Sequence, residues 1–225
     1  MLIYSLIPAR SGSKRIKDKN ILMFRGKTLL ELAIEQSLKT KKINRTFVTT
    51  DSKKYQEISI KTGAECPYLR PKNISRDTSS DLECFKHFLI KLRELNIKKP
   101  DIIVHLRATY PTRSVKLISL CINKFLSQKK IHSLRTIIKI KHNMQKMWFI
   151  NKKKLIYNPI TFNNEEHSLP FQSLKNTYLQ TNCVDIISVK NTIEKNSMTG
   201  KKIYGLKTNH NFDIDDIEDF NKINQ

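Results

Sequence analysis

The sequence predicts an α/β fold in which helices cover both faces of a mostly parallel sheet. Short apolar runs alternate with longer segments whose apolar residues recur at helical spacing. This alternation is typical of strand–helix–strand units. The apolar runs are nearly continuous, as expected of strands that are buried on both faces. At 225 residues the chain is long enough for one sizeable core with a small appendage.

The first half of the chain supplies two predicted strands and three predicted helices. The apolar run Leu2–Ile7 ends at Pro8 and indicates a buried strand. Thr28 and Glu31 have the spacing of a capping box, which marks the start of the first helix. We expect strands over 2–7 and 46–50, and helices over 28–39, from 51 or 52 to 62, and over 79–96.

The second half continues the alternation and then interrupts it. We expect strands over 101–106, 133–140 and 182–188, and helices over 114–127 and 215–223. Within Lys141–Tyr178 the pattern breaks down, and only a hairpin of 148–150 with 155–157 is indicated. The sequence therefore predicts a three-layer, Rossmann-like α/β fold with a small lobe that protrudes from it.

Composition narrows the class of protein without deciding it. The formal charge is +22, but Lys outnumbers Arg 32 to 10 and the cations are spread along the chain. A dedicated RNA-binding protein would concentrate Arg and interleave aromatic residues, so we expect no nucleic-acid partner. No apolar stretch approaches the roughly 20 residues of a membrane span, and we expect a cytoplasmic protein with no membrane partner. The four cysteines lie far apart, which indicates buried thiols.

The loop after the first strand is the most informative segment. It carries five cations between Arg10 and Asn20, and its Ser and Gly residues leave backbone N–H groups exposed. Guanidinium forks, ammonium charges and free amides together suit a triphosphate. The spacing matches neither a Walker A loop nor a GxGxxG turn. A solvated basic loop in a Lys-rich protein is the alternative.

Two carboxylates near the other end of the chain are candidates for a metal site. Asp213 and Asp215 flank Ile214, so in an extended segment both side chains point to the same side. Mg²⁺ binds one or two carboxylates together with phosphate oxygens and water. In the alternative, Asp215 caps the last helix and Glu218 completes a capping box.

Two further segments could contact a substrate. Arg70 and the helix start at Ser79–Asp81 could form a pocket for a base, although Ser80 and Glu83 also have capping-box spacing. Arg107 and Arg113 follow the predicted strand 101–106 and are candidates for holding a substrate carboxylate. In a parallel sheet this segment shares an edge with the cationic loop.

Taken together, the four segments resemble the acylneuraminate cytidylyltransferase family, which includes the CMP-sialic acid synthetases and their bacterial relatives. The similarity covers nearly the whole chain and implies a single cytidylyltransferase domain over 1–225. The motifs that carry it are PARSGSKRIKDKN at 8–20, RP-x₅-DTSSD from Arg70, LRATYPTR at 106–113 and FDIDDIEDF at 212–220.

The resemblance implies a role for each matching residue. The residues that match the family's triphosphate loop are Arg10, Ser13, Lys14, Lys19 and Asn20. Those that match positions around the cytosine are Arg70, Ser79 and Asp81. Arg107 and Asn182 match positions beside the sugar acid, and Asp213 and Asp215 match the metal-binding aspartates. Arg10, Lys19 and Asp215 are the expected catalytic residues.

The resemblance also implies the reaction, the cofactor and the assembly. We expect a Mg²⁺-dependent transfer of CMP from CTP to the anomeric hydroxyl of a nonulosonic acid of the sialic, legionaminic or pseudaminic type. The segment 141–178 resembles the family's dimerisation arm, which implies a homodimer. The family's frequent QPTSPLR reads RATYPTR here, and Cys183 stands where a glycine is common, so the departures lie on the sugar side. An eight-carbon octulosonic acid as the acceptor, and a non-enzymatic nucleic-acid-binding protein, are the alternatives.

Overall fold

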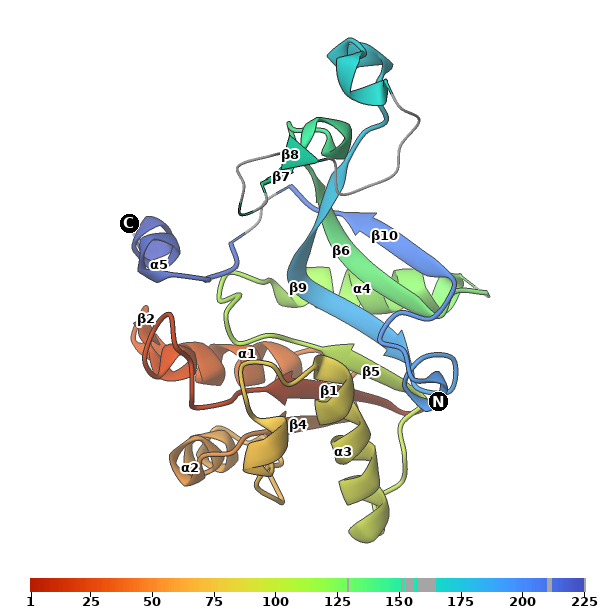
Figure 1. Cartoon of the computed structure of the whole chain (residues 1–225). Helices are drawn as coiled ribbons and strands as arrows, with labels where there is room; N and C mark the ends of the chain where they lie inside the picture. Colours follow the sequence, from red (N-terminus) through yellow and green to blue (C-terminus); the bar gives the residue numbers. More distant parts are fainter. Residues whose placement is uncertain (129, 151, 153–155, 158–164, 210–211, 225) are drawn as a thin grey trace.

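A six-stranded sheet organises the protein, in the order β10-β6-β9-β5-β1-β4. The computed structural model describes residues 1–128, 130–150, 152, 156–157, 165–209 and 212–224 (Figure 1). The strands are β1 (Ile3–Pro8), β4 (Arg45–Thr49), β5 (Ile102–His105), β6 (Ser133–Lys139), β9 (Tyr178–Ser188) and β10 (Ile203–Lys207). Strand β1 is parallel to β4 and β5, and β10 is parallel to β6, whereas β9 runs antiparallel to β5 and β6. The predicted three-layer, mostly parallel fold is confirmed.

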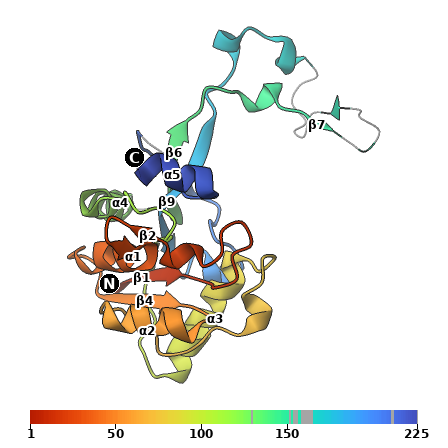
Figure 2. The same ribbon diagram turned by 90° about the vertical axis from the view of Figure 1, so that its left-hand side faces the viewer.

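Helices cover both faces of this sheet because the strands are apolar on both faces. The helices are α1 (Leu29–Leu38), α2 (Lys53–Lys61), α3 (Asp81–Glu94), α4 (Val115–Ser127) and α5 (Ile217–Asn224). Side chains alternate along β1, so Ile3 and Ile7 pack with the core of α1 and α4, whereas Tyr4 and Leu6 pack with α3. The sheet is therefore buried between two hydrophobic cores (Figures 1 and 2).

Capping side chains set the starts of four helices, as the sequence predicts. Thr28, Ser52, Ser80 and Ser114 each accept a hydrogen bond from the backbone N–H three residues later. Such caps satisfy donors that the first turn of a helix leaves unpaired. Helix α3 is shorter than expected because Ser80, not Ser79, is its cap and Glu94 is its last residue.

The predicted hairpin is also present in the protruding segment. β7 (Phe149–Ile150) pairs antiparallel with β8 (Ile156–Tyr157), while residues 151 and 153–155 between them lie outside the described part of the chain. The described parts of 141–178 extend beyond the ends of β6 and β9, away from the helices (Figure 2). Among the described residues, none of the helices has the length and apolar character needed to span a membrane.

Candidate active site

A cavity of about 530 Å³ opens at the carboxyl edge of the parallel strands. The loop after β1, the segment before α3 and the loop after β5 form its walls. The predicted site residues that line it are Arg10, Ser13, Lys14, Lys19, Asn20, Arg70, Ser79, Asp81 and Arg107. The expectation that the cationic loop and the segment after β5 share one edge of the sheet is thus confirmed, because β1 and β5 are parallel neighbours.

Buried and half-buried groups hold the cationic loop in place. The backbone N–H and the hydroxyl of Ser11 donate to Asp51 at 2.9 and 3.1 Å. At the other end of the loop, Tyr55 donates its hydroxyl to Asp18 at 2.9 Å. The side-chain amide of Asn20 donates to the carbonyl of Arg10 at 2.9 Å, so Asn20 braces the loop from within. Sequence reasoning considered Asp51 only as an alternative to Ser52 at the start of α2, and its contact with the cationic loop was missed.

In the cavity wall, Asp77 lies between two cations of the loop after β1. The carboxylate of Asp77 lies 2.5 Å from the guanidinium of Arg10 and 3.0 Å from the ammonium of Lys14. These two cations lower the pKa of Asp77. A carboxylate bound between an arginine and a lysine shows that this position accepts an anion. A phosphate oxygen carries the same charge and accepts the same hydrogen bonds.

In the predicted base pocket, Arg70 bonds residues of the protein, and Ser80 with Glu83 caps a helix. Arg70 is buried, and its guanidinium donates to Ser75 at 3.0 Å and to the thiol of Cys84 at 3.0 Å. Ser80 and Glu83 form the capping box of α3, which confirms the alternative interpretation for that pair. Ser79 and Asp81 flank this cap and line the cavity.

The loop after β1 meets the aspartate segment through Lys19. The ammonium of Lys19 donates to the carbonyl of Ile214 at 2.8 Å and lies 3.9 Å from the carboxylate of Asp215. Arg15 lies 3.4 Å from the same carboxylate. Burial lowers the pKa of Lys19, while the charges of Asp215 and Asp213 act in the opposite direction. The loop after β1 and the segment 213–215 therefore meet beside the cavity.

Asp213 forms hydrogen bonds with the loop after β5 and with β9. It accepts hydrogen bonds from the hydroxyl of Thr109 at 2.6 Å and from the side-chain amide of Asn182 at 3.0 Å. The N–H of Ile214 donates to the carbonyl of Thr109 at 2.9 Å, and the Ile214 side chain is fully buried. This contact fixes Asp213 beside the loop after β5, whereas Asp215 projects toward solvent.

The capping role considered for Asp215 is wrong. The backbone N–H of Asp219 donates to Asp216 at 2.9 Å, and the Asp219 carboxylate accepts from the N–H of Asp216 at 3.3 Å. The reciprocal pair at the start of α5 is therefore Asp216 with Asp219, one residue later than Asp215 with Glu218. Asp215 does not serve as the side-chain cap of that helix.

A bulge in β9 brings Asn182 to the site. The register of β9 against β6 shifts between Arg135 and Ile137, and Asn182 adopts a left-handed backbone with φ 56°. Asn tolerates this conformation better than most residues. The fully buried hydroxyl of Thr136 accepts from the N–H of Val184 at 3.1 Å and lies 2.9 Å from the hydroxyl of Thr181.

Arg113 does not face the cavity, contrary to its candidacy for holding a substrate carboxylate. Only 3% of it is exposed, and it donates to the carbonyls of Cys183 at 2.6 Å and of Arg107 at 3.1 Å. The guanidinium therefore clamps the β9 bulge to the loop after β5. Buried backbone carbonyls need such donors, and the sequence does not reveal which arginine supplies them.

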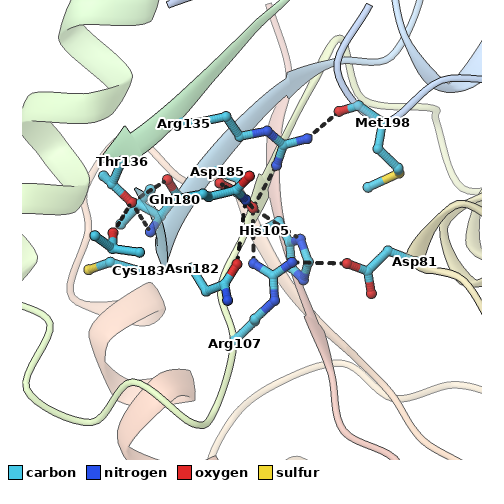
Figure 3. A network of polar contacts seen from close by, with 12 residues as sticks. Asp81, His105, Arg107, Arg135, Thr136, Gln180, Asn182, Cys183, Asp185 and Met198 are labelled. Carbon is cyan, nitrogen blue, oxygen red and sulfur yellow. Dashed lines mark hydrogen bonds and ion pairs between the residues drawn. The ribbon is translucent and has the colours of Figure 1, made fainter. Parts of the chain in front are cut away.

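Arg107 belongs to a buried ionic network that the sequence did not reveal. Its guanidinium lies 2.9 Å from Asp185 on β9 and 2.9 Å from Asp81 at the start of α3. Arg135 on β6 contacts the same Asp185 at 2.6 Å (Figure 3). The local signal was a carboxylate between the apolar residues Val184 and Ile186.

The residues predicted to bind a divalent cation are Asp213 and Asp215. Across the described residues, no group of three or more His, Cys, Asp or Glu side chains converges on a metal position. Two carboxylates beside an anion-binding cavity fit Mg²⁺, which completes its octahedral shell with phosphate oxygens and water. The residues therefore fit a metal that arrives with a phosphate ligand.

The fold and the cavity define a class of protein, an α/β protein with a cation-lined cavity at the carboxyl edge of its parallel strands. The sequence model of the cytidylyltransferase family matches residues 4–225, and the chain belongs to this family. It is therefore a nucleotidyltransferase.

Individual relatives agree with this assignment. The chain is 27% identical to the pseudaminic acid cytidylyltransferase of Campylobacter jejuni over 95% of its own length and 91% of that protein. It is 31% identical to the CMP-N,N'-diacetyllegionaminic acid synthase of Legionella pneumophila over 52% of its length and 50% of that protein. A solved CMP:2-keto-3-deoxy-manno-octonic acid synthetase complexed with CTP shares the fold, with a TM-score of 0.70 at 12% identity, covering 100% of this chain and 97% of that one.

The Thr136 hydroxyl provides a test of the β9 bulge. We expect Thr136→Val to lower the free energy of unfolding by about 1–3 kcal/mol, because it leaves buried polar groups of Thr181 and Val184 unpaired. Urea unfolding measures the change, with exposed Thr112→Val as the matched control, expected within about 0.5 kcal/mol of the unmodified protein. Equal stability of the two variants would show that Thr136 does not hold the bulge.

Proposed function

We propose that this protein transfers CMP from CTP to the anomeric hydroxyl of a 2-keto-3-deoxy nonulosonic acid and releases pyrophosphate. The family supports the nucleotidyl transfer. Relatives that act on pseudaminic and legionaminic acids support a nonulosonic acceptor. The observation that carries the proposal is the 2.8 Å contact of Lys19 with Ile214, since it joins a triphosphate-type loop to two carboxylates.

The nucleotide side of the cavity is built from the cationic loop and the start of α3. In the proposed complex the triphosphate replaces Asp77 as the partner of Arg10 and Lys14, because both anions meet the same two cations. Ser13 and Lys19 contact the phosphates from the same loop. The cytosine lies toward Arg70, Ser79 and Asp81, where polar groups converge beside the cavity.

The chemistry is a single displacement at the α-phosphorus. The anomeric hydroxyl attacks in line while its proton passes to a base, for which Asp215 is the candidate. Pyrophosphate leaves toward Arg10, Lys14 and Lys19, which stabilise its charge. Asp213 and Asp215 would hold Mg²⁺, which supplies charge neutralisation at the phosphate when bound. Phosphoryl transfer depends on positioning and electrostatics, so no covalent nucleophile is required.

The acceptor acid lies on the side of β5 and β9. Arg107 binds its carboxylate, because a guanidinium that already bonds the carboxylate of Asp81 has the geometry for another one. Asn182 lies beside the same space through its hydrogen bond to Asp213. The acceptor hydroxyl thus enters between Arg107 and the aspartates.

The protruding segment is proposed to form a homodimer contact. Its described residues include large apolar side chains that are 40–71% exposed, namely Met144, Met147, Trp148, Phe149 and Ile150. Exposed apolar side chains clustered in one segment mark an interaction surface. We propose further that the dimer acts in the cytoplasm, with no membrane or nucleic-acid partner.

A panel of acceptors tests the reaction directly. We expect pyrophosphate release from CTP with at least one acid among sialic, legionaminic and pseudaminic acids, and little with an eight-carbon octulosonic acid. A coupled phosphate assay with Mg²⁺ present measures it, with ATP, GTP and UTP as nucleotide controls. Turnover with the octulosonic acid alone would move the assignment to the alternative acceptor class.

Arg10 should matter at the transition state. We expect Arg10→Ala to lower kcat/KM by about a hundredfold or more, roughly 3 kcal/mol, because it removes a donor to the developing charge. Lys17, an exposed cation of the same loop outside the cavity wall, supplies the matched control Lys17→Ala. Near-normal turnover of Arg10→Ala would remove Arg10 from the mechanism.

Asp215 should determine the response to Mg²⁺. We expect Asp215→Asn to abolish the Mg²⁺-dependent part of the activity, because it removes one of the two proposed carboxylate ligands. Titration of initial rates with Mg²⁺ measures this. Asp216→Asn is the matched control, since its side chain caps α5 and an amide oxygen still accepts that bond. The same Mg²⁺ curve for Asp215→Asn and the unmodified protein would exclude Asp215 as a ligand.

A further inference from the structure

We propose that Asp185 and Arg135 are positioning residues that fix the guanidinium of Arg107 in the orientation in which it meets the acceptor's carboxylate. The inference rests on the proposed function, because it takes the acceptor to be a sugar acid. It adds two residues that do not themselves line the cavity.

The register of the sheet creates this arrangement. Asp185 on β9 lies directly opposite His105 on β5 and directly opposite Arg135 on β6. Residues opposite one another in adjacent strands project from the same face of the sheet. The three side chains therefore form a row across β5, β9 and β6, and Arg107 follows His105 by two residues at the cavity end of this row.

The charges along the row alternate in sign. Arg135, Asp185, Arg107 and Asp81 are joined in that order by contacts of 2.6, 2.9 and 2.9 Å (Figure 3). Arg135 and Asp185 form the buried end of the row, with side chains 8% and 0% exposed, and exposure then rises to 24% at Arg107 and 44% at Asp81. Arg107 is thus anchored at a buried carboxylate and presents its other edge to the cavity.

The buried end of the row is fixed by further contacts. Arg135 also donates to the carbonyl of Met198, and the amide of Gln180 donates to Asp185 at 3.3 Å. A carboxylate held by several donors cannot follow Arg107 if that side chain turns. Asp185 therefore restricts Arg107 to a narrow set of orientations.

His105 does not compete for the charge of Asp185. Burial, with the nearby cations Arg107, Arg135 and Arg113, lowers the pKa of His105 well below its ordinary value. The ring packs edge-on against Phe85 at 4.9 Å, and neither ring nitrogen has a hydrogen-bond partner among the described residues. Because the imidazole is neutral, the charge of Asp185 is balanced by the guanidiniums of Arg107 and Arg135.

Stability alone does not account for this row. A buried ion pair contributes little net stability compared with apolar residues of the same volume. The neighbours Val184, Ile186 and Ile187 on β9 are buried and apolar, so an apolar residue at 185 would continue the core. The charges of Asp185 and Arg135 are explained by the guanidinium of Arg107, which they hold in place at the cavity edge.

The test compares the two substrates in the Asp185→Asn variant. We expect the KM for the acceptor acid to rise on the order of tenfold to a hundredfold, because a misplaced binding group costs that much. The KM for CTP should stay within about twofold, because the triphosphate contacts the other loop. The matched control is Asp51→Ala, which removes both oxygens that accept from Ser11 and so loosens the cationic loop, and here the KM for CTP should rise instead.

A double-mutant cycle separates positioning from a general structural effect. In an Arg107→Met background, Asp185→Asn should change the acceptor KM by less than about twofold, because the residue that it positions is gone. The proposal would be overturned if Asp185→Asn raised the acceptor KM equally with and without Arg107. It would also be overturned if Asp185→Asn raised the KM values for the acceptor and for CTP in parallel. If Asp185→Asn fails to fold, Arg135→Lys, which keeps the charge but loses the planar fork, should raise the acceptor KM alone.

Calorimetry keeps this inference separate from the proposed function. Binding of the acceptor acid in the presence of CTP without divalent cation gives a dissociation constant that needs no turnover. An acid that binds the unmodified protein but is never converted would contradict the proposed reaction, and weaker binding of that acid to Asp185→Asn would still support the positioning role. Unchanged binding in the variant would refute that role.

Discussion

The hydrogen bond from Lys19 to the carbonyl of Ile214 is the constraint on which the site depends. It spans 195 residues of sequence and joins the loop after β1 to the aspartate segment. Lys19 is only 14% exposed there, and burial of an ammonium is unfavourable unless it is satisfied. The Ile214 carbonyl and the Asp215 carboxylate satisfy it, and the buried Ile214 side chain anchors the segment in the core. Asp213 and Asp215 do not line the cavity themselves, but they contact Thr109 and Lys19, which do.

Acidic residues of the protein occupy positions that suit anionic substrates. Asp77 bridges Arg10 and Lys14, and Asp81 pairs with Arg107. Asp77 and Arg10 are both about a third exposed, whereas Asp81 is 44% exposed and its partner Arg107 only 24%. Exposed ion pairs contribute little stability, so a substrate oxygen can replace these carboxylates at small cost. The cavity therefore keeps its cations ordered before a polyanion enters.

Local patterns made much of the fold predictable from the sequence. Helix starts could be predicted because capping depends on residues only three or four positions apart, as at Thr28, Ser52, Ser80 and Ser114. Strand β10 was missed because it is half-exposed and contains Gly205, so no apolar pattern marks it. The helix expected over 79–96 ends earlier, at Glu94, and Leu95 in its C-cap is 43% exposed. The Asp185 network and the Arg113 clamp depend on cross-strand register, which no local pattern encodes. Asn182 was placed at the sugar side by resemblance alone, because the β9 bulge that brings it to Asp213 arises from a shift in cross-strand register.

A crystal structure of the protein with CTP and Mn²⁺ would test the central claim most directly, because anomalous scattering locates the metal independently of the nucleotide. The triphosphate should lie against Arg10 and Lys19, with Mn²⁺ bound to a carboxylate oxygen of Asp213 or Asp215 and to a phosphate oxygen. A metal bound away from both aspartates, or a triphosphate that does not contact the loop after β1, would contradict the assignment of these two segments to one nucleotide site.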